Sequence, residues 1–255
     1  MLVIKIFLIL GCILLQACSH FRSVEGPMNH VNDFFKCDIR PKTLLALLPG
    51  AYDTPQDYID QNFVKEVRNR NIYADIQIVD AHIGYYTNAQ IVKRLEEEVV
   101  SPAKSKGYEK IWFIGISLGG YGSLLYSMNN PTALEGVLLM APYMGVKDVH
   151  MEVQSQGGLK TWVSKNEATT DLNLWQWLKG YALPSADMPK LFIGYGDNDR
   201  FAKPNGLLAD ILPKARVTII PGGHDWKTWH QLWTGFLDTS FLQRFDQTPL
   251  SCKIQ

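Results

Sequence analysis

The pentapeptide Gly115-Ile116-Ser117-Leu118-Gly119 is the part of the sequence best suited to chemistry. It follows an apolar run at 111–114 and precedes a segment with helical spacing. A serine at a sharp turn between a strand and a helix is held in a strained conformation that projects its Oγ, and glycines on either side let strand and helix approach. Amides at the start of the helix favour negative charge there. The context predicts that Ser117 is a nucleophile.

A serine hydroxyl is a weak nucleophile at neutral pH, so Ser117 needs a base to take its proton and an acid to orient that base. Of the six histidines, His224 is our candidate, because it lies in the Pro- and Gly-rich turn after the last apolar run. His82 also follows an apolar run, but it precedes Ser117, against the chain order serine, acid, histidine. We interpret His82 as structural.

The acid is expected at the end of the apolar run before His224, where the segment 193–201 contains two aspartates. We favour Asp199, because Asp197 is better suited to cap the turn by accepting hydrogen bonds from neighbouring amides. Asp225 is adjacent to His224, so its side chain diverges from the imidazole. We expect Asp225 to cap the final helix instead.

Attack on a carbonyl creates an oxyanion, which needs donors aimed at the position where the charge forms. The backbone N–H of Leu118, directly after the serine, is one candidate. The loop after the first apolar run, Leu48-Pro49-Gly50-Ala51-Tyr52-Asp53, supplies the other. Gly50 permits a tight turn there, and Ala51 presents its amide.

Short apolar runs alternate with longer segments of helical periodicity, which predicts a mostly parallel sheet flanked by helices. The strand candidates are 43–48, 74–79, 111–114, 137–140, 191–193 and 217–220, after an irregular stretch up to about residue 42, and the helix candidates are 57–70, 88–106, the segment after Ser117, and 226–242. The stretch 143–190, with Trp162, Trp175 and Trp177, interrupts the alternation. We expect a small helical cap over a substrate pocket there, and local helical packing is the alternative.

The N-terminus has the layout of a secretory signal over residues 1–17, with Lys5 before a short apolar run. The run ends in Leu15-Gln16-Ala17-Cys18, which resembles a bacterial lipoprotein cleavage box. Cys18 would then carry the lipid, including palmitate, and residues 18–42 would form a tether to the membrane. Ser19 points to the outer membrane, facing the periplasm, in a Gram-negative cell. A plain signal peptide or an uncleaved anchor is the alternative.

Four cysteines are present, of which Cys12 would leave with the signal and Cys18 would be lipidated. Cys37 and Cys252 remain, and they are expected to form a disulfide in an oxidising periplasm, with two free thiols as the alternative. No Cys-x-x-Cys or His-Glu-x-x-His spacing supports a zinc site. Lys+Arg and Asp+Glu balance at 25 each without long blocks of one sign, so nothing indicates a nucleic-acid partner.

The strand order, the serine turn, the placement of Asp199 in a Gly-x-x-Asp spacing, and His224 together resemble the α/β-hydrolase superfamily across about residues 43–242. The resemblance implies one α/β-hydrolase domain over 43–255 with the cap inserted at about 143–190. It also implies an acyl-enzyme on Ser117, hydrolysis by water that His224 activates, and neither metal nor organic cofactor. Many members have His-Gly where this chain has Pro49-Gly50.

The expected function is hydrolysis of carboxylic esters that carry an apolar group, by a monomer that acts on small-molecule or lipid esters. The tryptophans of the insertion and the predicted lipid anchor motivate this expectation. Acyltransferases, thioesterases and peptidases use the same triad, and the fold alone does not choose among them. A lipid-anchored binding protein without turnover is the alternative of a different class.

Overall fold

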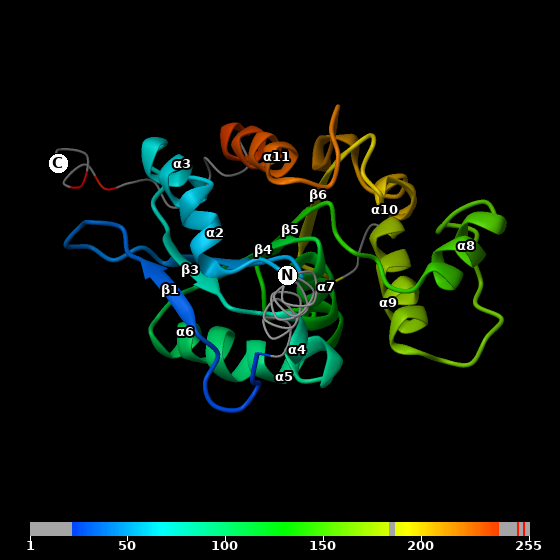
Figure 1. Ribbon diagram of the computed structural model, residues 1–255, viewed down its shortest axis with the longest axis horizontal. Helices are drawn as coiled ribbons and strands as arrows, with labels where there is room; N and C mark the ends of the chain where they lie inside the picture. Colours follow the sequence, from blue (N-terminus) through cyan, green and yellow to red (C-terminus); the bar gives the residue numbers. More distant parts are fainter. Residues whose placement is uncertain (1–21, 184–186, 240–248, 250–251, 253–255) are drawn as a thin grey trace, which may run out of the picture.

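A seven-stranded sheet forms the centre of the computed structural model, which describes residues 22–183, 187–239, 249 and 252. The strand order is β1-β3-β2-β4-β5-β6-β7, with β1 antiparallel to β3 and the other neighbours parallel (Figure 1). The strands are β1 (His30–Asp33), β2 (Thr43–Leu48), β3 (Asp75–Val79), β4 (Lys110–Ile116), β5 (Gly136–Met140), β6 (Lys190–Gly196) and β7 (Val217–Ile220). The predicted class, a mostly parallel sheet flanked by helices, is confirmed.

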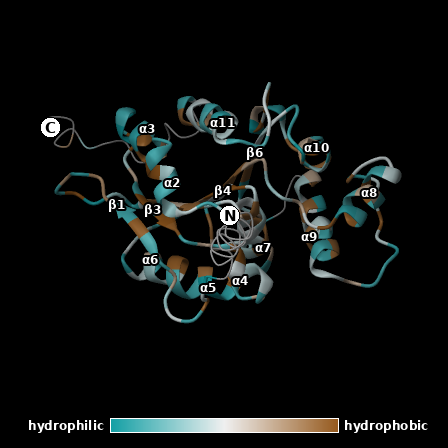
Figure 2. Cartoon of the chain, in the orientation of Figure 1, coloured by the Kyte–Doolittle hydropathy of each residue, from teal (hydrophilic) through white to brown (hydrophobic). Residues whose placement is uncertain are grey.

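The six predicted strands correspond to β2 through β7. β2, β3 and β5 are buried along their whole length, because helices cover both faces of the sheet, and Figure 2 shows hydrophobic strands inside more polar helices. The prediction of an irregular stretch up to residue 42 was wrong at β1. That edge strand is mostly exposed and has no apolar run, and its pairing with β3 comes from tertiary structure.

Helices lie on both sides of the sheet, with α2, α3 and α11 on one face and α5, α6 and α7 on the other (Figure 1). The helical segments are α2 (Pro55–Asp60), α3 (Phe63–Asn69), α4 (Ile83–Thr87), α5 (Ile91–Leu95), η2 (Glu96–Val100), α6 (Ser101–Ser105), α7 (Leu118–Asn129), α8 (Lys147–Ser155), α9 (Thr170–Leu178), η3 (Lys179–Ala182), α10 (Ala202–Ala209), η4 (Lys214–Arg216) and α11 (Trp226–Asp238). The single helix predicted at 57–70 is two helices, because Asn62 adopts a left-handed conformation at φ 61°.

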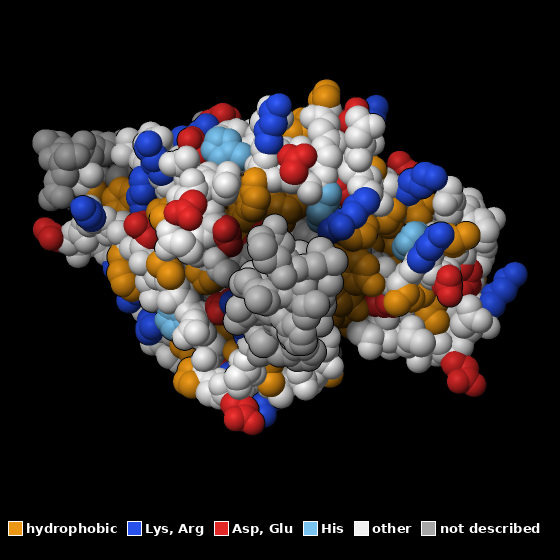
Figure 3. All heavy atoms as spheres, in the orientation of Figure 1, with side chains coloured by type: hydrophobic (Ala, Val, Ile, Leu, Met, Phe, Trp, Pro, Cys, Tyr) orange, Lys and Arg blue, Asp and Glu red, His pale blue; other side chains and the backbone are white. Residues whose placement is uncertain are grey.

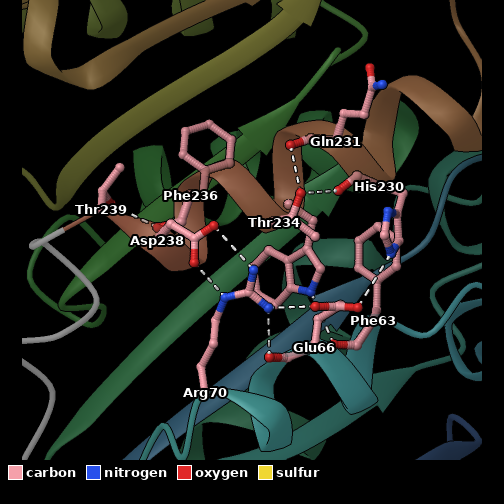
Figure 4. Close-up of polar contacts among 10 residues, drawn as sticks. Phe63, Glu66, Arg70, His230, Gln231, Thr234, Phe236, Asp238 and Thr239 are labelled. Carbon is pink, nitrogen blue, oxygen red and sulfur yellow. Dashed lines mark hydrogen bonds and ion pairs between the residues drawn. The ribbon is translucent and has the colours of Figure 1, made fainter.

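α3 and α11 are joined along their length, which matters because α11 begins directly after the candidate histidine loop (Figure 4). The Trp233 indole donates to the Phe63 carbonyl at 3.0 Å, and the two rings stack at 5.6 Å. At the far end, Arg70 donates to both carboxylate oxygens of Asp238, at 2.7 and 3.1 Å, and also pairs with Glu66. These hydrogen bonds, that to Asp238 first, raise the pKa of Arg70.

The segment between β5 and β6 forms α8, α9 and η3, which lie together at one end of the molecule (Figure 1). Asp171, in the first turn of α9, accepts hydrogen bonds from the Tyr121 hydroxyl of α7 and from the Val146 N–H at 2.7 Å. Trp162 and Trp175 are 0% exposed, and their indoles donate to Glu152 and to the Met144 carbonyl. These two tryptophans therefore pack the segment internally and do not line an open pocket.

The predicted signal over 1–17 and the predicted lipidation site Cys18 lie outside the described residues. Within the described residues, no helix combines the length and the apolar character needed to cross a bilayer. The described part of the tether contains β1, whose residues pair with β3.

A disulfide joins Cys37 to Cys252, with their Cα atoms 5.4 Å apart and a sequence separation of 215. Such a bond stabilises a protein mainly because it restricts the unfolded chain, and the restriction grows with loop length. The pairing expected from the cysteine count is present.

Reduction is expected to lower the melting temperature and to decrease the free energy of unfolding by up to about 5 kcal/mol, as the chain-entropy model gives for so long a loop. Thermal unfolding followed by circular dichroism, with and without dithiothreitol, measures the effect. The Cys37→Ser/Cys252→Ser double variant is the control. Its melting temperature should be lower than that of the oxidised wild type and should be the same with and without dithiothreitol. An unchanged melting temperature after verified reduction would contradict the prediction.

Candidate active site

Ser117 occupies the turn between β4 and α7 in a conformation that is rare for a side chain larger than glycine, with φ 50° and ψ −114°. Three backbone hydrogen bonds hold it there. Its N–H donates to the Met140 carbonyl at 3.0 Å, and its carbonyl accepts from the N–H groups of Tyr121 at 3.2 Å and Tyr143 at 3.0 Å. Strain of this kind persists only where surrounding structure enforces it, and it is typical of functional sites.

Glycines beside the serine allow a contact that a side chain would prevent. A Cβ atom on Gly119 would lie 2.1 Å from the Leu48 carbonyl oxygen, and one on Gly115 would lie 2.5 Å from the Gly119 carbonyl oxygen. The first turn of α7 therefore packs directly on the loop that follows β2. The two glycines of the sequence motif have this steric role.

The structure brings Ser117, His224 and Asp199 together in one hydrogen-bonded chain, from loops that follow β4, β7 and β6. His224 Nδ1 lies 2.8 Å from Asp199 Oδ2, and His224 Nε2 lies 2.9 Å from Ser117 Oγ. A carboxylate only accepts, so Nδ1–H donates to Asp199, and Nε2 is left to accept from the serine hydroxyl. This arrangement can transfer the serine proton to the imidazole.

Asp199 and Asp197, the two candidate acids, have different positions. Asp199 is 5% exposed, and its second oxygen accepts from the Phe201 N–H at 2.7 Å. Asp197 is exposed, and its Oδ1 accepts from the Gly222 N–H at 3.1 Å, which ties the acid turn to the histidine loop. Within the described residues, Asp197 thus braces the histidine loop and not, as had been expected, the backbone amides of its own turn, and Asp199 is the one that reaches His224.

Asp225 and His82, the other residues weighed from the sequence, both lie at helix N-termini. Asp225 caps α11 and accepts from the Thr228 N–H at 2.9 Å, and that hydrogen bond is the main cause of its lowered pKa. His82 caps α4 and accepts from the Gly84 N–H. Burial, followed by the charge of Arg22, lowers the pKa of His82.

The two backbone amides proposed from the sequence as oxyanion donors belong to the two segments that meet where Gly119 packs on the Leu48 carbonyl. Leu118 is the first residue of α7, and Ala51 follows Gly50 in the loop after β2. A Cβ atom on Gly50 would lie 3.6 Å from the Ser117 Cβ, so this loop is next to the serine. No backbone hydrogen bond from either N–H to another described residue is present.

Aromatic rings around His224 belong to the site, although no sequence motif marks them. Phe201 and Trp229 each contact the imidazole edge-on, with ring centroids 5.0 Å away and interplanar angles of 88° and 89°. Tyr143 continues this apolar wall from Phe201 toward Tyr121. Figure 3 shows hydrophobic side chains gathered on this face of the molecule, beside α9 and below α11.

Comparison with models of known protein families gives no match, and comparison with curated proteins gives none either. Solved structures do match. Est1E from Butyrivibrio proteoclasticus has a TM-score of 0.62 at 14% identity, covering 87% of this chain and 96% of that one. The fluorophosphonate-binding serine hydrolase FphF from Staphylococcus aureus has 0.59 at 15% identity, covering 85% and 99%. A ferulic acid esterase has 0.55 at 16% identity, covering 88% and 100%.

The chain has the α/β-hydrolase fold. The coverage of the matched structures is nearly complete, so the likeness concerns the whole domain and not one motif. At these identities it establishes the α/β-hydrolase architecture alone, and the roles of individual residues depend on the geometry of this chain.

The Asp199→Asn substitution is expected to slow covalent modification of Ser117 by a fluorophosphonate about 10³- to 10⁴-fold. An amide nitrogen in place of Oδ2 would face Nδ1–H, and the imidazole would need the other tautomer, which cannot accept at Nε2. The matched control, Asp197→Asn, keeps an acceptor oxygen for the Gly222 N–H and should lose less than about tenfold. Second-order rate constants from intact-protein mass spectrometry measure both. Equal losses in the two variants would contradict the assignment.

Proposed function

We propose that this protein is a serine hydrolase that cleaves carboxylic esters with an apolar group through an acyl-enzyme on Ser117. The observation that carries the proposal is the chain of hydrogen bonds from Asp199 through His224 to Ser117, at 2.8 and 2.9 Å. Its fold is shared with a ferulic acid esterase, with Est1E and with a fluorophosphonate-binding serine hydrolase. The likeness supports the class of reaction and does not specify a substrate.

In the proposed reaction, Ser117 Oγ attacks the ester carbonyl carbon while its proton moves to His224 Nε2. Asp199 stabilises the imidazolium that results, and the N–H groups of Leu118 and Ala51 donate to the oxyanion. Collapse of the tetrahedral intermediate breaks the bond to the alcohol oxygen, which receives the proton from Nε2. Water, deprotonated by the same nitrogen, then attacks the acyl-enzyme. The bond from the acyl carbon to Ser117 Oγ breaks, Oγ takes the proton back from Nε2, and the acid is released.

The preference for an apolar group is supported by the rings next to His224. Phe201 and Tyr143 form an apolar wall beside the imidazole, where part of the substrate must lie during the reaction. Burying a methylene against such a wall contributes about 0.8 kcal/mol. The buried Trp162 and Trp175 do not add to this support, and the segment 143–190 is proposed as a cap on its position alone.

Labelling with a fluorophosphonate probe is expected to be complete for the wild type, absent for Ser117→Ala, and slowed strongly for His224→Ala. The reason is that attack requires the serine oxygen and a base to take its proton. In-gel fluorescence of the purified full-length protein in detergent measures the label. A folded wild type without label would contradict the proposal and favour a binding protein without turnover.

A panel of chromogenic substrates then tests the substrate class on the same protein. We expect hydrolysis of p-nitrophenyl esters, with kcat/KM rising about three- to fourfold for each added acyl methylene up to the limit of the pocket. Activity on thioesters or amides alone would replace the ester proposal with a thioesterase or a peptidase. Transfer of the acyl group to an added alcohol faster than to water would indicate an acyltransferase.

We also propose, from the sequence, that Cys18 carries lipid and holds the domain at a membrane, the outer membrane in a Gram-negative cell. Residues 15–18 and the preceding apolar run support this. Two or three acyl chains hold a protein at a bilayer stably, whereas one gives reversible binding.

Cells grown with an alkyne analogue of palmitate should incorporate it into the wild type and not into Cys18→Ser. The wild type should sediment with membranes, because its acyl chains are buried in the bilayer. Cys37→Ser is the control and should keep the label. Membrane association that persists in Cys18→Ser without labelling would instead indicate an uncleaved anchor.

A further inference from the structure

Asp53 is a carboxylate at the candidate active site that the proposed mechanism does not use. It ends the turn that carries Ala51, since its N–H donates to the Gly50 carbonyl at 3.3 Å. A Cβ atom on Gly50 would lie 2.4 Å from Asp53 Oδ2 and 3.6 Å from Ser117 Cβ. The carboxylate therefore folds back over the turn, on the side of Gly50 that faces the serine.

Hydrogen bonding from the Gly50 backbone and from the Trp226 side chain lowers the pKa of the Asp53 carboxyl, against the effect of burial. Trp226 is the first residue of α11 and lies two positions after His224. Its ring also packs edge-on against Tyr58 and Phe63, at 5.4 and 5.6 Å, so the indole is fixed in place. Asp53 thus connects the turn that carries the Ala51 amide to the segment that carries the base.

The surroundings of Asp53 are costly for a carboxylate. Burial is the main cause of its raised pKa, and the neighbouring Asp57 raises it further, while the hydrogen bonds and His224 act in the opposite direction. The Tyr58 hydroxyl donates to the Leu48 carbonyl at 2.9 Å, and burial, followed by the charge of Asp53, raises the pKa of Tyr58. A half-buried acid without a partner cation is retained only where its hydrogen bonds compensate for the lost hydration.

We propose that Asp53 is a positioning residue, which holds the turn 50–53 so that the Ala51 N–H is aimed at the oxyanion. This inference rests on the proposed function. Oxyanion donors contribute to catalysis only if they are in place before charge develops, because reorientation during the reaction has its own free-energy cost.

The test compares kcat, KM and the inhibition constant of an alkyl boronic acid in the full-length protein. The boronic acid forms a tetrahedral adduct with Ser117 and places an oxygen where the oxyanion forms. Asp53→Ala should lower kcat about 10- to 100-fold, somewhat less than complete loss of one donor, and leave KM within about twofold. The inhibition constant should rise by the same factor as kcat falls. Asp53→Asn retains one acceptor oxygen, so its kcat and its inhibition constant should lie between those of Asp53→Ala and the wild type.

Asp57→Asn is the matched control, because Asp57 is a neighbouring carboxylate whose contact is with Thr54 at the start of α2, at 2.7 Å. It should keep kcat and the boronic acid affinity within about twofold of the wild type. Trp226→Phe removes the indole N–H but keeps an aromatic ring. Its losses of kcat and of boronic acid affinity should be smaller than those of Asp53→Ala.

Wild-type kcat and boronic acid affinity in a folded Asp53→Ala would overturn the proposal, and so would equal losses in Asp57→Asn. If Asp53→Ala does not fold, Asp53→Asn decides, and an unchanged ratio of inhibition constant to KM would overturn it. A wild type that neither hydrolyses esters nor binds the boronic acid at Ser117 would overturn the proposed function as well. The two failures are therefore distinguishable.

Discussion

The contact between Gly119 and the Leu48 carbonyl sets the geometry on which the rest of the site depends. It brings the first turn of α7 against the loop after β2, so the serine and the Gly50–Asp53 turn share one surface. β2 and β4 are neighbours in the sheet, in register from Thr43 with Lys110 to Leu48 with Gly115. The sheet therefore determines the separation of the two loops, and the glycine permits their contact.

The loop that carries His224 is also positioned by a close approach between a glycine and a backbone carbonyl. A Cβ atom on Gly196 would lie 2.3 Å from the Gly222 carbonyl oxygen, and the Asn198 N–H donates to that oxygen at 3.0 Å. α11 is held at its start by the Asp225 cap and at its end by Arg70. His224 is thus a loop residue with little freedom, which suits a base that must stay within hydrogen-bond distance of Ser117.

Sequence reasoning was successful where one physical signal dominated. Buried parallel strands are apolar runs, so β2 to β7 were predictable, and a serine between glycines after such a run marks the elbow. β1 carries no such signal, because it is an exposed edge strand. Asp53, Phe201 and Trp229 were missed for a related reason: each meets the site through tertiary packing, with no spacing in sequence to mark it. The tryptophans of the segment 143–190 were interpreted from the sequence as substrate contacts. Two of them, Trp162 and Trp175, are instead buried in the packing of that segment.

The Cys37–Cys252 bridge has a consequence for how the chain responds to damage. It closes residues 37–252 into a covalent ring that contains every strand except β1 and every group of the proposed triad. A single proteolytic cut in a surface loop of that ring, such as the stretch between α8 and α9, opens the circle but leaves one molecule. Two cuts, or one cut followed by reduction, are needed before any piece can diffuse away. Nicked copies would therefore keep their sheet assembled.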